Sequence, residues 1–309
     1  MGNGNAPTLQ SMCFCEENCR QTYTDWTAVS PETTETGAAD LFYTVLFNGT
    51  NLLDRSIMNY EKELNGFLEY AGHYDRTNGM IELKVVHTLR VAEVMDRITA
   101  GLDLPDETRY LAALCAVFHD IGRFEQVTRY GTYNDRRSVN HAVLSCEVLR
   151  ENGFLEHLPG KHQEMVLTAI ENHNKLTIDD GLDENTMLLA KLIRDADKVD
   201  IFRVFAEEEM VDTMGETIEM VEQETVTDEV FEHFMAHECV PKDIRRTGLD
   251  IWVGFLAFFY DMNFPQSMKI ALEEGYYRRQ FDHAEFTLPE TRERVEAILC
   301  ELESYLDRF

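Results

Sequence analysis

The chain has 309 residues, of which 44% are hydrophobic, and its 28 Lys and Arg are outnumbered by 57 Asp and Glu, which gives a formal net charge of −29. This composition supports a hydrophobic core, but it argues against a nucleic-acid partner, because that affinity depends on clustered Lys and Arg. A small phosphorylated substrate remains compatible with it, since a few local cations or metal ions can reverse the field inside a pocket.

The sequence also argues against a secreted or membrane protein. The most apolar segment, residues 251–260 (IWVGFLAFFY), is about half the roughly 20 residues that a helix needs to cross a bilayer. No secretion signal is evident at the start, and an odd number of cysteines does not favour a disulfide framework. We therefore expect a cytoplasmic protein with no membrane partner. The isolated cysteines are expected to be small core residues: Cys115, Cys146, Cys239 and Cys300.

Residues 1–57 differ from the remainder of the chain and are interpreted as a partly irregular N-terminal extension. Stretches such as MGNGNAPTLQ and SPETTETGAAD are small and polar, as in tails and loops. Cys13, Cys15 and Cys19 lie close together, but no fourth ligand is nearby, so a structural zinc site is not favoured. Residues 58–309 are expected to form a single helical domain without internal repeats.

The pattern from residue 58 onward is helical, with no alternating strands and no βαβ rhythm. Apolar residues recur at helical spacing. Pro105 with Asp106 and Glu107 is a typical helix start, and Gly122 stands where a C-terminal cap belongs. The fold class is therefore predicted to be all-α. The expected helices cover residues 81–95, 105–120, 138–153, 162–174, 185–205, 211–238, 244–260, 266–274 and 290–306.

Five successive helices each carry His or Asp at the edge of an apolar stripe, which predicts that these groups point toward a common interior. The residues are His87, His119 with Asp120, His141, His173 and Asp197. A single histidine on an apolar face is usually an ordinary core residue. Four imidazoles and two carboxylates together, with no nearby excess of Lys or Arg to pair them, would be costly to bury. A divalent metal accepts both ligand types directly, so the sequence predicts a metal site.

This series resembles the defining motif of the HD-domain superfamily of metal-dependent phosphohydrolases. The segment RDADKVD, residues 194–200, is similar to the family's last motif, in which the second Asp of DAD is the ligand, here Asp197 rather than Asp195. His141 in NHAVLSCEVL and His173 in ENHNK resemble the extra histidines of the two-metal members. The resemblance covers residues 80–205 and implies a compact helical bundle, to which residues 206–309 add accessory helices.

The resemblance implies two divalent ions, with iron or manganese favoured and zinc, cobalt or nickel compatible. One ion would take His87, His119, Asp120 and Asp197. The other would take His141 and His173, with Asp120 bridging. The implied reaction is attack of a metal-activated hydroxide on phosphorus, which cleaves a phosphate ester of a nucleotide or another small molecule.

Several cations are candidates for binding the phosphate. Lys84 lies one turn before His87 on the same helix face, and Lys198 follows Asp197, where similar family members use a lysine on phosphate. With Asp120, these two lysines form the predicted catalytic set. Arg123 follows the HD turn, and Arg136 and Arg137 lie in the loop before His141; each is also compatible with an ordinary surface cation or ion pair.

Two alternative functions remain open at this stage. The same six ligands support oxidative cleavage in a few di-iron relatives, and a non-catalytic ligand-binding domain would keep the metal for structure. The Gly-Tyr-Pro signature of the cyclic dinucleotide phosphodiesterases is missing after His173, which makes that activity unlikely on sequence grounds. His233, His237 and Cys239 fit an amphipathic helix better than a second metal site, and the apolar residues 231–264 are interpreted as core that could include a homodimer surface.

Overall fold

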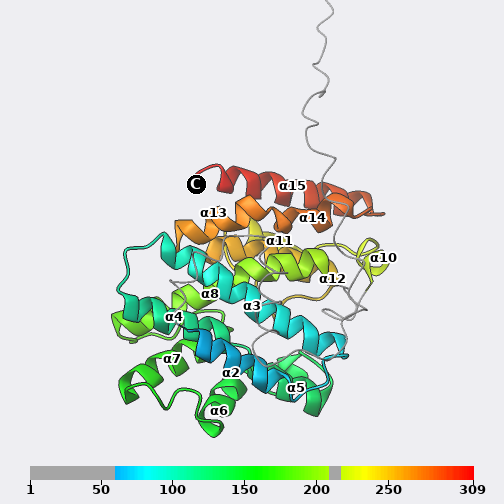
Figure 1. Cartoon of the computed structure of the whole chain (residues 1–309). Helices are drawn as coiled ribbons and strands as arrows, with labels where there is room; N and C mark the ends of the chain where they lie inside the picture. Colours follow the sequence, from blue (N-terminus) through cyan, green and yellow to red (C-terminus); the bar gives the residue numbers. More distant parts are fainter. Residues whose placement is uncertain (1–59, 209–216) are drawn as a thin grey trace, which may run out of the picture. The chain divides into compact units, whose positions relative to one another are not determined.

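The computed structural model of the chain describes residues 60–208 and 217–309. These residues form helices joined by short loops, with no strand among them, which confirms the predicted all-α class (Figure 1). The proposed extension 1–57, with Cys13, Cys15 and Cys19, lies outside the described residues. Its boundary therefore stays a prediction.

Helix α8 lies at the centre of the fold. It spans Glu184–Glu207 and packs against three helices of the first half of the described chain and against α14 (Tyr276–His283) of the second half. Buried residues occur on most of its faces, as expected for a helix that is surrounded on all sides. The three earlier neighbours are α3 (Gly79–Ala100), α4 (Asp106–Phe118) and α7 (Gly160–Asn172).

Side-chain caps fix the starts of three helices that later carry site residues. Asn78 caps α3, Asn140 caps α6 (His141–Glu151) and Asp183 caps α8, each by accepting hydrogen bonds from backbone N–H groups of the first turn. Such caps satisfy donors that the helix itself leaves unpaired. They therefore set where each helix begins, and with it the register of the site residues.

Gly122 does not cap α4, contrary to the expectation from sequence. Helix α4 ends at Phe118, and Gly122 is the first residue of a further helix, α5 (Gly122–Tyr130), that the sequence pattern had not revealed. A Cβ atom at Gly122 would lie 2.5 Å from the backbone nitrogen of Ser145 and 2.8 Å from the carbonyl carbon of Leu144. The glycine therefore permits close contact between α5 and α6.

Helix α2 (Glu61–Ala71) packs on α4, while the helices after α8 cover another side of the α3–α8 pair. α13 (Pro265–Glu274) contacts both α3 and α8, and α11 (Asp228–Met235) joins α12 (Gly248–Leu256) to α15 (Pro289–Leu306). Figure 1 shows these later helices together on one side of α3, with α2 and α4–α7 on the other.

The single helix expected over residues 211–238 is wrong for the part of it that the structure describes. The chain there forms a short helix α10 (Ile218–Val221), leaves helical structure, and resumes it only in α11. The break contains Thr225, Val226 and Thr227, whose β-branched side chains disfavour helix. Its backbone has other partners, since Thr227 N donates to Asp250 Oδ1 over 2.8 Å.

The expected helix 244–260 is likewise shorter. Thr247 and Asp250 form a reciprocal capping box, so α12 begins only at Gly248. After Leu256 the chain tightens into the 3-10 helix η3 (Ala257–Asp261). This leaves residues 236–247 as a loop, and that loop borders the site described below.

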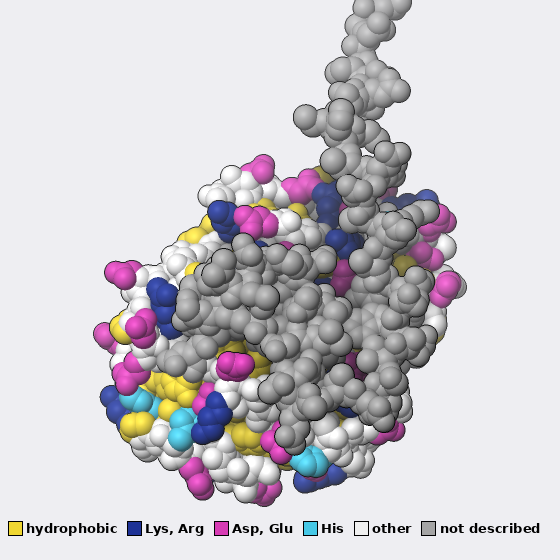
Figure 2. All heavy atoms as spheres, in the orientation of Figure 1, with side chains coloured by type: hydrophobic (Ala, Val, Ile, Leu, Met, Phe, Trp, Pro, Cys, Tyr) yellow, Lys and Arg dark blue, Asp and Glu magenta, His cyan; other side chains and the backbone are white. Residues whose placement is uncertain are grey.

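The four described cysteines differ in how deeply they are buried. Cys115 and Cys146 are buried as predicted, but Cys239 is only partly buried and Cys300 is exposed, so these two are not core residues. None of the described helices is long and apolar enough to cross a membrane. Figure 2 shows Asp and Glu side chains scattered among Lys and Arg over the visible part of the described surface.

Candidate metal centre

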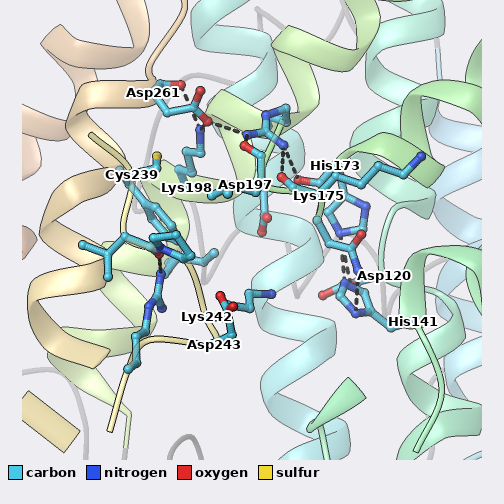
Figure 3. Close-up of a pocket in the computed structure, with 18 of the residues that line it drawn as sticks. Asp120, His141, His173, Lys175, Asp197, Lys198, Cys239, Lys242, Asp243 and Asp261 are labelled. Carbon is cyan, nitrogen blue, oxygen red and sulfur yellow. Dashed lines mark hydrogen bonds and ion pairs between the residues drawn. The ribbon is translucent and has the colours of Figure 1, made fainter. Parts of the chain in front are cut away.

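The ends of three helices and the middles of two bring the predicted ligands together. His87 lies within α3 and Asp197 within α8, whereas His119 ends α4, His141 begins α6 and His173 ends α7. Asp120 occupies the turn between α4 and α5. Figure 3 shows Asp120, His141 and His173 side by side, with Asp197 reaching into the same cavity from α8.

Each imidazole is fixed through its Nδ1 atom. Nδ1 of His119 donates to the Ala116 carbonyl over 2.8 Å, and Nδ1 of His173 donates to the Ile170 carbonyl over 2.6 Å. The other two use carboxylates: Nδ1 of His87 lies 2.7 Å from Asp200 Oδ2, and Nδ1 of His141 lies 2.7 Å from Asp135 Oδ2. Carbonyl and carboxylate oxygens only accept, so the proton of each neutral ring resides on Nδ1.

The lone pairs on the four Nε2 atoms consequently point toward one another. Those of His87 and His119 are 3.3 Å apart, and those of His141 and His173 are 3.1 Å apart. Neither contact can be a hydrogen bond when both rings carry their proton on Nδ1, because neither atom then has a proton to donate. We call His87 with His119 the α3–α4 pair, and His141 with His173 the α6–α7 pair.

Asp120 lies between the two pairs and presents one oxygen to each. Its Oδ2 is 3.7 and 3.6 Å from the Nε2 atoms of the α3–α4 pair, and its Oδ1 is 3.5 and 3.8 Å from those of the α6–α7 pair. Oδ1 is buried and has no hydrogen-bond partner among the described residues. Asp197 joins the α3–α4 pair, with Oδ1 3.1 Å from His87 Nε2 and 3.7 Å from His119 Nε2.

The environment holds most of these groups in the protonation state that a metal requires. Burial lowers the pKa of His119, that of His141 to about 4 and that of His173 to about 3. Burial alone would raise the pKa of Asp120, but Lys84 and the adjacent cationic groups outweigh it and hold that pKa well below its usual range. His87 differs, because Asp197 and Asp200 outweigh burial and raise its pKa.

These features fit a divalent metal. Neutral imidazoles and ionised carboxylates converge, and the Nε2 lone pairs within each histidine pair face each other. Arg123 Nη2 donates to Nε2 of His141 over 3.3 Å, and Oδ1 of Asp120 is buried without a hydrogen bond from the described residues. Potential ligand atoms form two sets, and within each set all atoms lie within 4.8 Å of one another. The first set is His87, His119 and Asp197; the second is His119, Asp120 and His173. His141 is outside both sets but adjoins the second through His173.

Comparison with known families agrees with this geometry. Residues 85–201 match the family model of the HD domain. The chain contains an HD domain. This confirms the resemblance drawn from the motifs, and HD domains bind divalent metals and are mostly metal-dependent hydrolases. Searches of curated proteins and of solved structures returned no match.

The HD centre opens into a cavity of about 280 Å³. Lys84, Arg123, Arg136 and Lys198 line it, whereas Arg137 is exposed and is not among the lining residues. The sequence suggested no excess of Lys or Arg near the ligands, but two cations do pair with Asp120: Lys84 Nζ donates to its Oδ2 over 2.7 Å, and Arg123 Nε lies 3.4 Å from its Oδ1.

Lys198 has a different partner from the one that the motif implied. Its Nζ donates to the backbone carbonyl of Asp261 over 2.8 Å and also to the Asp261 carboxylate, which accepts from Arg194 as well. Figure 3 shows Lys198 beside Asp261 at the edge of the cavity. Asp261 therefore neutralises two cations of the HD motif.

Several residues around the HD centre could not be identified from the sequence. Asp135 orients His141 from an irregular loop, where no periodicity marks it. Asp261, Lys242 and Arg245 line the cavity from the segment after the HD domain. Asp200 contacts His87, whereas Asp195 accepts hydrogen bonds from the backbone of Asn263 and Phe264 and so holds the start of α13.

The H-x3-H-x-C group does not assemble. His233 lies 3.0 Å from Glu238, and His237 Nε2 lies 2.7 Å from Glu301. Cys239 instead lines the cavity, with Sγ 3.8 Å from the carbonyl of Ala257. The three side chains thus have separate partners. The amphipathic helix expected to carry them is wrong for His237 and Cys239, because α11 ends at Met235.

Proposed function

We propose that the HD domain is a two-metal phosphohydrolase that cleaves a phosphate ester of a nucleotide or another small molecule. The observation that carries the proposal is the orientation of Asp120, whose two oxygens face two histidine pairs at the end of a cavity rich in Lys and Arg. Mixed N/O ligation suits several divalent metals, and the resemblance to the two-metal members favours iron or manganese among them.

Each residue has a distinct role in the proposal. The α3–α4 pair and Asp197 would hold one ion, the α6–α7 pair would hold the other, and Asp120 would contact both. Bound ions at such a site activate water and offset negative charge on a phosphoryl group. Asp200, Asp135 and the two backbone carbonyls keep the imidazoles oriented, as the partners of metal-ligating histidines generally do.

In this proposal, Lys84 and Arg123 bind the scissile phosphate. Both cations now face Asp120. A metal ion on Asp120 Oδ2 would compete with Lys84 Nζ, which leaves the amine to bind a phosphoryl oxygen. Lys198 can reach a substrate only by releasing Asp261, so we expect its contribution to depend on that exchange. We further propose that the protein acts in the cytoplasm; the described cysteines are all unpaired.

Purified full-length protein can test this function. Metal content is measured first, followed by phosphate release from a panel of nucleotides and sugar phosphates, in air and without oxygen. We expect release of phosphate that does not require oxygen. An oxygen requirement without phosphate release would instead favour the di-iron oxygenase, and metal binding without any turnover would favour the ligand-binding domain.

Substitution of Asp120 tests the bridging role. Asp120→Ala removes the carboxylate that faces both histidine pairs, so we expect loss of turnover together with a lower metal content. The matched control is Asp180→Ala, which removes an exposed carboxylate and should leave both quantities unchanged. Full turnover in the Asp120 variant would show that the assigned role is wrong.

A further inference from the structure

The cavity is positively charged although the chain as a whole is strongly acidic. Its lining contains eight Lys and Arg but only four Asp, in a chain with a formal net charge of −29. Two of the four, Asp120 and Asp197, belong to the predicted metal ligands, so bound ions would make the cavity more positive. Such a pocket attracts anions. The eight cations are Lys84, Arg123, Arg136, Lys175, Arg194, Lys198, Lys242 and Arg245.

Five of the eight cations already have carboxylate partners. The partners are Asp120 for Lys84 and Arg123, Asp261 for Arg194 and Lys198, and Asp179 for Lys175. The remaining three are Arg136, Lys242 and Arg245, and no ion pair joins any of them to a carboxylate of the described residues. Arg245 donates only to the Val240 carbonyl, over 2.7 Å, and stacks on Phe255.

All three cations line the same cavity, and Arg245 is near enough to both Arg136 and Lys242 for their charges to repel. Arg136 belongs to η2 (Asp135–Arg137), and Lys242 and Arg245 belong to the loop between α11 and α12. Burial, reinforced by Arg136, lowers the pKa of Arg245 to about 10. Lys242 is exposed, but its limited solvation in the cavity lowers its pKa. The charges of Arg123 and Arg245 lower this pKa as well, whereas those of Asp135 and Asp197 raise it.

Lys242 and Arg245 enter the cavity from the loop between α11 and α12, whereas Arg136 directly follows Asp135, the partner of His141. Figure 3 shows Lys242 and Asp243 across the cavity from Asp120 and His141. Asp243 is the only cavity carboxylate that is neither a predicted metal ligand nor paired with Arg194 and Lys198. The loop therefore presents more positive than negative charge to the side of the cavity opposite the HD turn.

We propose that Arg136, Lys242 and Arg245 form a second anion subsite, and that the substrate carries a second phosphate in addition to the one that is cleaved. This inference rests on the proposed phosphohydrolase function and specifies its substrate class as a small bisphosphorylated compound. A dianionic phosphate matches a group of three cations better than a single carboxylate does. The cavity volume of about 280 Å³ suits a small molecule.

The origin of Lys242 and Arg245 explains why the substrate class is not evident from the HD motif. Lys242 and Arg245 come from the segment after residue 201, where the family match ends. Gly254 supports the placement of Arg245, since a Cβ atom there would lie 2.5 Å from Cζ of Arg245. Two of the three cations thus come from a loop outside the matched HD residues, and Arg136 comes from within them.

Matched pairs of substrates provide the test. Metal-loaded full-length protein is assayed with adenosine 5′-monophosphate and adenosine 3′,5′-bisphosphate, and with fructose 6-phosphate and fructose 1,6-bisphosphate. Wild-type protein should prefer the bisphosphate of at least one pair. Lys242→Ala and Arg136→Ala should each raise KM for that bisphosphate about tenfold and alter KM for its monophosphate less than about threefold, since one charged contact corresponds to about a factor of ten.

Arg137→Ala is the control, because Arg137 neighbours Arg136 but is not among the residues that line the cavity. It should leave both KM values unchanged. Equal effects on both members of a pair, or a wild-type preference for monophosphates, would overturn the second subsite while leaving the phosphohydrolase intact. If no ester is hydrolysed, the proposed function fails, and calorimetric binding of the two bisphosphates decides the subsite separately. Loss of binding in Lys242→Ala but not in Arg137→Ala supports it, and absence of binding to wild-type protein overturns it.

Discussion

Asp200 controls the orientation of His87 without belonging to the predicted ligand set. Its Oδ2 lies 2.7 Å from His87 Nδ1, and Arg203 donates to both of its oxygens. Burial alone would raise the pKa of Asp200, but the hydrogen bond from His87 and the contact with Arg203 lower it to about 2. The carboxylate therefore stays ionised and keeps the His87 proton on Nδ1, which leaves Nε2 directed toward the metal site.

We expect Asp200→Asn to weaken metal binding by about 10- to 100-fold, because a neutral amide orients and polarises the imidazole less strongly than a carboxylate. Metal affinity is measured by titration of the metal-free protein. The control is Asp195→Asn, the same change on the same buried helix, since Asp195 contacts the start of α13. An equal loss of affinity in both variants would show that the effect arises from distortion of α8 and not from His87.

At the residue level, the sequence identifies groups that recur with helix periodicity and misses those that loops supply. The six predicted ligands were identifiable because each adjoins an apolar stripe, and the structure brings them together. Asp135 and Lys242 lie in segments without periodicity, so their positions depend on how the loops fold back. The pairing of Lys198 with Asp261 joins residues 63 positions apart and has no local signal.

At the level of elements, the contact between α5 and α6 places the Asp120 turn beside His141. Gly122→Ala would put a methyl group against the backbone of α6, which cannot move aside as a flexible side chain can. We expect a loss of about 1–3 kcal/mol in the free energy of unfolding, together with weaker metal binding. Urea unfolding measures the first quantity.

Gly160→Ala is the matched control for this substitution. Gly160 begins α7, and a Cβ atom there would meet nothing within 4 Å, so the variant should be neutral or slightly stabilising. A similar loss of stability in both variants would contradict the close contact of α5 with α6.

The junction of α2 with α3 should give the protein a pH-dependent stability. Tyr60, at the start of α2, donates to Asp96 Oδ2 of α3 over 2.6 Å, and burial raises the pKa of Asp96 to about 6. The unfolded carboxyl has its ordinary pKa near 3.8. Between these values the folded protein binds more protons than the unfolded chain, so this contribution falls as the pH rises from about 4 to about 6.

Asp96→Asn should remove that contribution and make the protein more stable than wild type above pH 7, by about 1–3 kcal/mol. The measurement is urea unfolding of both proteins in chelator at pH 4.5, 5.5 and 7.5. The difference between the two curves isolates Asp96 from the other titrating groups. A constant difference across this range would contradict the raised pKa.

Element boundaries were predicted well where packing and local signals agree, and poorly where tertiary partners replace helical hydrogen bonds. The last helix was expected over residues 290–306 and forms as α15, Pro289–Leu306. The break before α11 depends instead on Asp250, which accepts from Thr227 across 23 positions. Helix α14, which packs on α8, was not predicted, because its few apolar residues lie among charged ones.

For the whole molecule, the predicted metal ligands bring together side chains from widely separated parts of the HD domain. They come from α3, the α4–α5 turn, α6, α7 and α8, and therefore from both ends of the HD domain. Without metal, Lys84 and Arg123 offset only part of the negative charge and lone pairs that converge on Asp120 and the four Nε2 atoms. Metal binding should consequently stabilise the folded state as a whole.

A ligand that binds only the folded protein stabilises it by about 2.7 kcal/mol at 100 times its Kd and by about 4.1 kcal/mol at 1,000 times its Kd. For a protein of this size, such energies correspond to a rise in Tm of about 4–8 °C. We therefore expect manganese or iron(II) to raise the Tm of metal-free protein by this amount, and chelator to reverse the rise. Asp120→Ala should show little of the shift, because its histidine pairs lack the shared carboxylate, whereas Asp180→Ala should behave as wild type. A metal-dependent rise of equal size in the Asp120 variant would place the stabilising ion elsewhere in the molecule.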